Sequence, residues 1–116
     1  MPSDFYAPLD HMNVLFIQTT GPASTEPVVD DLTRIMAAAL NDAEPIGGMF
    51  GKHFCSCGAS SSDSSLRLAT NQRTNALAVH YLAHHRGEVP PNELDKVRNL
   101  GSDQAEPTPA QLKSPR

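Results

Sequence analysis

Two cysteines and two histidines are the residues of this chain whose types and spacing could do chemistry. Cys55 and Cys57 are the only cysteines, with a serine between them and a glycine directly after them. His80 and His84 follow after a gap of 22 residues. Two thiolates and two neutral imidazoles complete a tetrahedral ligand set, and zinc fits such a set best. The sequence therefore predicts a zinc site held by Cys55, Cys57, His80 and His84.

The four-residue spacing of the two histidines places them about 40° apart on one face of a helix. Leu77 and Tyr81 flank them, so both imidazoles are expected to face the interior. Buried ring nitrogens need a hydrogen-bond partner or a metal, because an unpaired polar atom in a core is costly. His85 is expected to point elsewhere, and we rank it with His11 as a weaker substitute ligand.

His53 is the alternate ligand. It precedes Cys55 by two residues, and an extended strand would turn both side chains to the same side. His53 could then replace one thiolate or one of the helix histidines. The sequence leaves this choice open.

Other chemistries for the cysteine pair are less favoured. A disulfide between Cys55 and Cys57 would close a very small, strained ring and constrain almost no chain. Four protein ligands leave no open position on zinc, which indicates a structural site rather than a catalytic one. The helical motif of zinc proteases requires a glutamate where this chain has Tyr81. A small zinc hydrolase with three ligands, a bound water and Glu88 or Asp63 as base is the enzymatic alternative.

Nucleic-acid binding is the second alternative. The ligands have the types and order of the two-cysteine, two-histidine DNA finger, but that finger separates its inner ligands by about twelve residues. Here the gap is 22 residues, and the cysteines are closer together. The basic residues of the second half show no dense clustering; they are Lys52, Arg67, Arg73, Arg86, Lys96 and Arg98. The sequence gives nucleic-acid binding little support.

Composition indicates one domain with a modest core. The chain has 116 residues, of which 39% are hydrophobic, with no tryptophan and with ten prolines. A bound metal would contribute folding free energy that a small core lacks. The net charge of −4 is uneven, because residues 1–43 carry six acids and a single base, Arg34.

Hydrophobic periodicity predicts three helices, over residues 26–41, 74–86 and 92–100. Apolar and β-branched runs predict short strands over residues 12–18, 52–55 and 66–68. Residues 1–11 are expected to form a flexible N-terminal arm, and residues 101–116 a disordered tail. The expected fold is α+β, mainly α with a few short strands, in which a metal site clasps a single domain over residues 12–100.

The chain is expected to be cytoplasmic and to lack a membrane segment. Its N-terminus has no basic region followed by an apolar run, and nowhere do about 18 apolar residues follow one another. The function that fits best is a non-enzymatic, zinc-stabilised intracellular domain that binds another protein. No catalytic residue and no small-molecule substrate are predicted.

Overall fold

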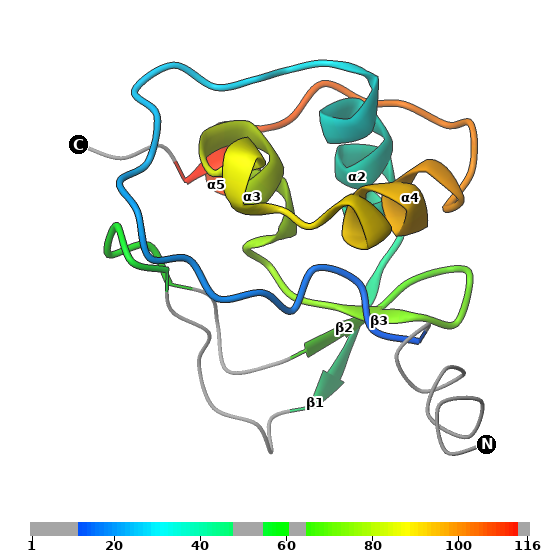
Figure 1. Cartoon of the computed structure of the whole chain (residues 1–116). Helices are drawn as coiled ribbons and strands as arrows, with labels where there is room; N and C mark the ends of the chain where they lie inside the picture. The colour runs from blue at the N-terminus through cyan, green and yellow to red at the C-terminus, as the bar shows by residue number, and fades with distance from the viewer. Residues whose placement is uncertain (1–11, 48–54, 61–64, 114–116) are drawn as a thin grey trace, which may run out of the picture.

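The computed structural model describes residues 12–47, 55–60 and 65–113. Within them, four α-helices pack above a small three-stranded antiparallel sheet (Figure 1). This confirms the expected α+β class. The predicted strand at 52–55 lies almost wholly outside the described residues, as do His53 and the N-terminal arm. No helix among the described residues is long and apolar enough to cross a membrane.

Helix α2 (Asp31–Asn41) begins five residues later than the sequence predicts. Asp30 adopts an extended backbone conformation, and its carboxylate accepts a hydrogen bond from Thr33 N, as an N-cap residue does. Residues 26–29 instead lie against helix α3 (Ala78–His84), where Val28 N donates to Ala83 O. Asp30 thus caps the helix, and Asp31 is its first residue.

Helix α3 (Ala78–His84) is shorter than the predicted 74–86. The first predicted residue belongs instead to strand β3 (Arg73–Thr74). The Asn75 side chain then accepts a hydrogen bond from Leu77 N, just before the helix begins. At its other end His85 leaves the helical conformation, with φ −132° and ψ 33°. A short 3₁₀ turn, η1 (Arg86–Glu88), follows, and helix α4 (Pro91–Arg98) closely matches the predicted 92–100.

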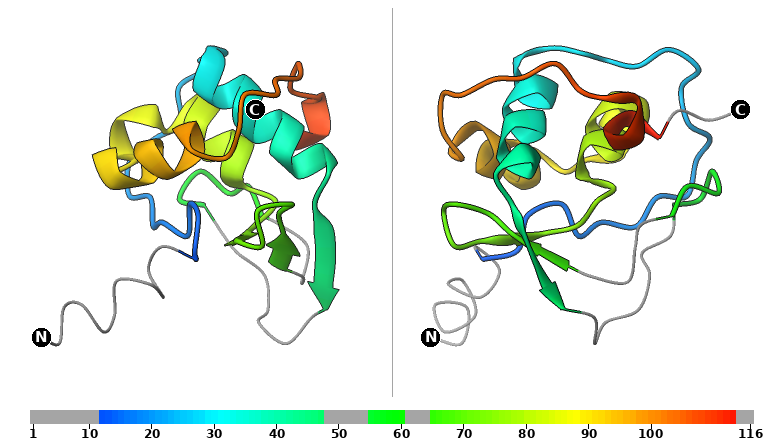
Figure 2. Two further views of the ribbon diagram at one scale, coloured as in Figure 1. Left: turned by 90° about the vertical axis from the view of Figure 1, so that its right-hand side faces the viewer. Right: turned by 180° about the vertical axis from the view of Figure 1, so that it is seen from behind.

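A further helical turn, α5 (Pro109–Leu112), lies in the segment that we expected to be disordered. Thr108 and Gln111 form a capping box at its start. Gln111 also donates to Ala37 O and Asn41 Oδ1 of α2. Leu112 packs against the hydrophobic core, and together these contacts hold α5 beside α2 and α3, as two further views show (Figure 2).

The sheet has the order β1-β2-β3, formed by β1 (Glu44–Gly47), β2 (Ser65–Arg67) and β3. The predicted strand at 66–68 is thus present one residue earlier. Residues 12–18 form no strand beyond a single bridge between Asn13 and Arg73, because Leu15 turns the chain with φ 60°. The Leu15 side chain is nevertheless fully buried.

Residues 12–30 form an N-terminal strap that passes around α3 before α2 begins (Figure 1). The strap is tied to the end of α3, since Ser24 N donates to His84 O and Val28 N to Ala83 O. The hydrophobic core lies between the strap, the helices and the sheet. Its fully buried apolar residues include Val14, Leu15, Met36, Leu77, Val79, Leu82 and Val97. The strap and the end of α3 both contact the cysteine turn, which is formed by residues 55–59.

Candidate metal centre

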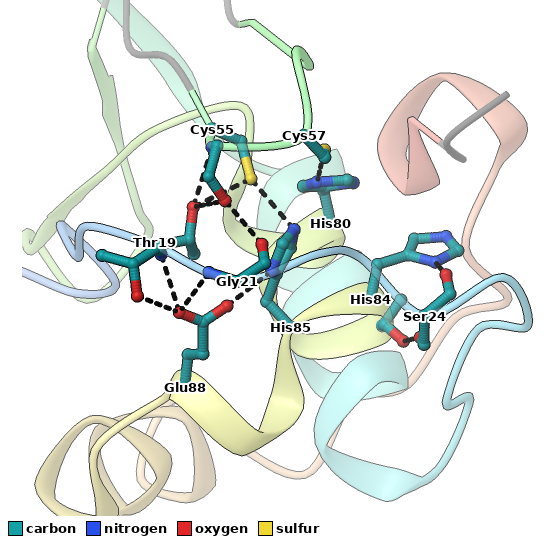
Figure 3. Close-up of polar contacts among 12 residues, drawn as sticks. Thr19, Gly21, Ser24, Cys55, Cys57, His80, His84, His85 and Glu88 are labelled. Carbon is teal, nitrogen blue, oxygen red and sulfur yellow. Dashed lines mark hydrogen bonds and ion pairs between the residues drawn. The ribbon is translucent and has the colours of Figure 1, made fainter.

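Cys55, Cys57, His80 and His85 converge into one group, the cysteine–histidine cluster (Figure 3). One donor atom of each residue lies within 4.8 Å of the other three. Cys55 Sγ is 3.0 Å from His85 Nε2, and Cys57 Sγ is 3.3 Å from His80 Nε2. Three of the four residues are buried, and Cys57 is partly exposed. The cluster could hold a metal ion.

A tight turn presents both thiols to the same side. Cys55 N donates to Ala59 O, and Gly58 N donates to Cys55 O, which closes the turn around Ser56 and Cys57. Gly58 has φ 99°, a backbone conformation that residues other than glycine rarely adopt. The glycine that follows the cysteines in the sequence is therefore needed by the backbone of the turn.

The structure brings together three of the four sequence-predicted ligands, namely Cys55, Cys57 and His80, and does not bring in His84. The His84 ring faces the strap, where its Nδ1 lies 2.7 Å from Ser24 O. His85, which we expected to point elsewhere, takes the fourth position. The helical projection assumed that the helix runs past residue 85, whereas α3 ends at His84 and the backbone turns the His85 ring towards the thiols.

Both clustered histidines have their outward ring nitrogen bonded to a protein acceptor. His85 Nδ1 lies 2.9 Å from Glu88 Oε2, and His80 Nδ1 lies 2.9 Å from the carbonyl oxygen of Leu112. Since a carboxylate and a carbonyl can only accept, each Nδ1 carries the proton and donates. In the neutral form of each ring, Nε2 then presents a lone pair to the cysteines, which is the form in which imidazole binds a metal.

The Cys55 thiol has an outer partner of its own. Thr19 Oγ1 lies 3.1 Å from Cys55 Sγ, and it also accepts a hydrogen bond from Ser56 N at 3.0 Å. A hydroxyl that accepts from a backbone N–H can direct its own proton towards a thiolate. The strap thereby contributes a hydrogen-bond donor to the sulfur.

Burial favours the neutral forms of Cys57 and His80. Burial raises the pKa of the Cys57 thiol, and the neighbouring Cys55 raises it further. Burial lowers the pKa of His80, and the nearby His85 and His84 lower it further. Neutral imidazoles are ready to bind a cation, while the thiols need a cation beside them to lose their protons. Glu88 behaves differently, since the backbone N–H of Thr20 and the His85 ring lower its pKa to about 2.

His84 is left with one ring nitrogen unsatisfied. Its Nε2 is buried and has no hydrogen-bond partner within the described part of the chain. The His84 and His80 ring centroids lie 5.3 Å apart, yet only His80 points into the cluster (Figure 3). The orphaned nitrogen costs stability, so His84 is held here by packing and by its bond to Ser24 rather than by full hydrogen bonding.

Comparison with protein-family models, with curated proteins and with solved structures finds no significant match. The chemistry of this chain must therefore be inferred from its own residues. Two sulfurs converge from the cysteine turn, and two imidazole nitrogens converge from α3 and from the residue that follows it. They form a soft ligand set of the kind that binds transition-metal ions.

Proposed function

We propose that this chain is a small zinc-stabilised domain whose ion is bound by Cys55, Cys57, His80 and His85. The observation that carries the proposal is the convergence of their four donor atoms within 4.8 Å. Zinc has no geometric preference beyond four ligands at tetrahedral positions, and thiolate–imidazole sets suit it well. Calcium and magnesium are disfavoured because they require oxygen ligands.

The role of the proposed ion is structural. Four protein ligands fill the coordination shell of zinc and leave no position for a water or a substrate. Burial supports this, since Cys55, His80 and His85 are 6%, 0% and 3% exposed. The ion would join the cysteine turn to the end of α3 and contribute folding free energy to a chain with a modest core.

A domain with a closed metal site acts through its surface, and we propose that it binds another protein. The two cysteines form no disulfide with each other. A reducing compartment would keep both thiols available as ligands, so the proposed site fits the expected cytoplasmic location. The nucleic-acid alternative gains no support. Four of the basic residues considered for it are ion-paired within the protein, namely Arg67, Arg86, Lys96 and Arg98.

Metal analysis of the protein purified without added zinc tests the proposal. We expect one zinc per chain in the wild type and less than about a tenth of that in Cys57→Ser and His85→Ala, because each removes a ligand. His84→Ala is the matched control, since it removes a neighbouring buried imidazole that bonds Ser24 instead of facing the thiols. Loss of zinc in His84→Ala with retention in His85→Ala would reverse the ligand assignment.

Cobalt substitution separates a closed site from an open one. Cobalt in a tetrahedral site of two sulfurs and two nitrogens gives intense visible absorption bands together with a thiolate charge-transfer band. We expect these bands and no change when azide is added, because no position is free. Weak bands, or a spectrum that shifts with azide, would favour the hydrolase alternative over the structural role.

A further inference from the structure

We propose that Glu88 is a positioning residue that couples metal binding at His85 to the docking of residues 19–21 of the strap. This inference depends on the proposed zinc site and adds a consequence to it. Occupancy of the site would control how firmly one segment of the surface is held.

The two oxygens of Glu88 contact two separate parts of the molecule (Figure 3). Oε2 accepts from His85 Nδ1 at 2.9 Å. Oε1 accepts from the backbone N–H groups of Thr20 at 2.8 Å and Gly21 at 3.2 Å. A single carboxylate thus joins a cluster histidine to the backbone of the strap.

On the histidine side, Glu88 sets both the tautomer and the direction of the ring. The His85 side chain is 0% exposed, and Glu88 is the partner of its Nδ1 in the folded chain. With the proton fixed at Nδ1, the lone pair of Nε2 is directed towards Cys55 Sγ at 3.0 Å. A carboxylate on the outer nitrogen also makes the imidazole a more basic ligand.

On the strap side, residues 19–21 have few other attachments, and these lead to the same cluster. Thr19 Oγ1 contacts Cys55 Sγ and accepts from Ser56 N, while Ser56 Oγ donates to Gly21 O. The hydrogen bond from Thr20 N to Glu88 is exposed, and exposed bonds contribute little unless the acceptor is held in place. A fixed His85 would hold that acceptor.

The coupling is therefore reciprocal. A cation on Nε2 withdraws electron density from the ring and strengthens the bond from Nδ1–H to Glu88, which holds the carboxylate in front of Thr20 and Gly21. In return, a docked strap keeps Glu88 oriented towards His85. The free energy by which metal binding stabilises the docked strap must equal the free energy by which the docked strap stabilises metal binding.

Zinc affinity in Glu88→Gln and Glu88→Ala provides the first test, measured by competition with a chromophoric chelator. Loss of an outer-shell carboxylate weakens metal binding by about 10- to 100-fold, and we expect Glu88→Ala to fall in this range. Glu88→Gln should lie between it and the wild type, because an amide keeps one accepting oxygen. We also expect a shift in the cobalt spectrum of both variants.

Glu93→Gln is the matched control. Glu93 also accepts from a strap amide, Leu15 N, and also bonds a side chain three residues away in sequence, but it contacts no cluster residue within the described part of the chain. We expect its zinc affinity and cobalt spectrum to match the wild type even if the fold is less stable. Equal weakening in Glu88→Gln and Glu93→Gln would show a purely structural effect and overturn the proposal.

Amide hydrogen exchange in the wild type gives a test that needs no variant. Zinc should slow exchange at Thr20 and Gly21 more than at Asn71, an exposed residue whose amide bonds Leu68 O in the turn before β3 and which, like them, exchanges through local opening. Equal slowing at all three amides would overturn the coupling while leaving the zinc site intact. Failure of the wild type to bind zinc at all would instead reject the proposed function, so the two failures are distinguishable.

Discussion

Glu88 and Glu93 hold the same N-terminal strap at two places, and their partners differ. Glu93 Oε1 accepts from Leu15 N at 2.7 Å, and Glu88 Oε1 accepts from Thr20 N at 2.8 Å. In each case the second oxygen bonds a side chain three residues away in sequence. For Glu93 this is the Lys96 ammonium at 2.7 Å, and for Glu88 it is the His85 ring at 2.9 Å.

The two partners differ in charge and in chemistry. The Lys96 and Glu93 side chains are 8% and 11% exposed, so a permanent buried ion pair fixes the strap at Leu15. His85 belongs to the cysteine–histidine cluster, which could hold a metal ion. Similar geometry thus gives one permanent attachment and one attachment that we propose to be conditional on metal.

Metal withdrawal should have the largest effect, because it tests the conditional attachment directly. With free zinc at a thousand times its dissociation constant, binding stabilises the folded chain by about 4 kcal/mol. We expect urea unfolding to show this loss when a strong chelator is added. Glu93→Gln should lose the same amount of stability when the chelator is added, since the contact between Glu93 and Leu15 does not involve the metal site. An unchanged unfolding midpoint with chelator would contradict the zinc-stabilised domain.

Replacement of the permanent attachment should come next. Glu93→Ala removes the carboxylate from a buried ammonium and from the Leu15 amide, and we expect a loss of about 3 kcal/mol. The double variant Glu93→Leu, Lys96→Met should recover part of the loss, because it removes both charges from the interior. Denaturant unfolding should give the same loss of stability for Glu93→Ala with zinc as without it. A loss found only with zinc would erase the distinction between the two attachments.

A third ion pair near the strap tests how much exposure weakens such attachments. Arg86 binds both carboxylate oxygens of Asp30, at 2.7 and 2.8 Å, but the Asp30 side chain is 47% exposed. Asparagine keeps the helix cap, so Asp30→Asn should cost only about 1 kcal/mol at neutral pH. Urea unfolding of the variant beside the wild type checks this value.

The same pair predicts a pH dependence. The hydrogen bonds and charge of Arg86 hold the pKa of Asp30 well below its usual range. A lowered folded-state pKa gives stability that is present above the unfolded value of about 3.9 and is lost as the pH falls through the folded value. The difference between wild type and Asp30→Asn should therefore stay constant from about pH 7 to 5 and shrink below about pH 4. A difference that grows with acidification would contradict this assignment.

The smallest effect is expected at Glu106, which pairs with Arg34 at 2.9 Å but is 76% exposed. Glu106→Gln should change stability by less than about 0.5 kcal/mol, because water and salt screen an exposed pair. Thermal unfolding should shift by less than about 4 °C. A larger shift would mean that the segment carrying α5 depends on this ion pair more than on Gln111 and its backbone contacts.

The three longer helices and strand β2 were predicted from sequence, although most of their ends were not, and β1, β3 and α5 were missed. Apolar periodicity and proline position gave α4 to within two residues at its end, because those signals act within the helix itself. The starts of α2 and α3 were missed because contacts with distant segments decide them. Val28 bonds the end of α3, and residues 73–74 join the sheet.

Residues 12–18 show a similar limit. Their β-branched and aromatic content favours a strand, yet Leu15 takes a positive φ. Glu93 bonds its amide, and the Asn75 side chain donates to its carbonyl oxygen. Both partners lie more than 50 residues away in sequence, so no local pattern could indicate the turn.

The sequence by itself determined which residue types meet, because the chain has a single cysteine pair and its apolar helix carries a compact group of histidines. Only the tertiary structure decided which histidine joins His80. Helix periodicity favours His84, but α3 ends there, and the turn towards Glu88 brings His85 to Cys55. The physical reason is that ring direction depends on backbone dihedrals at a helix end, and those are set by strap contacts distant in the sequence.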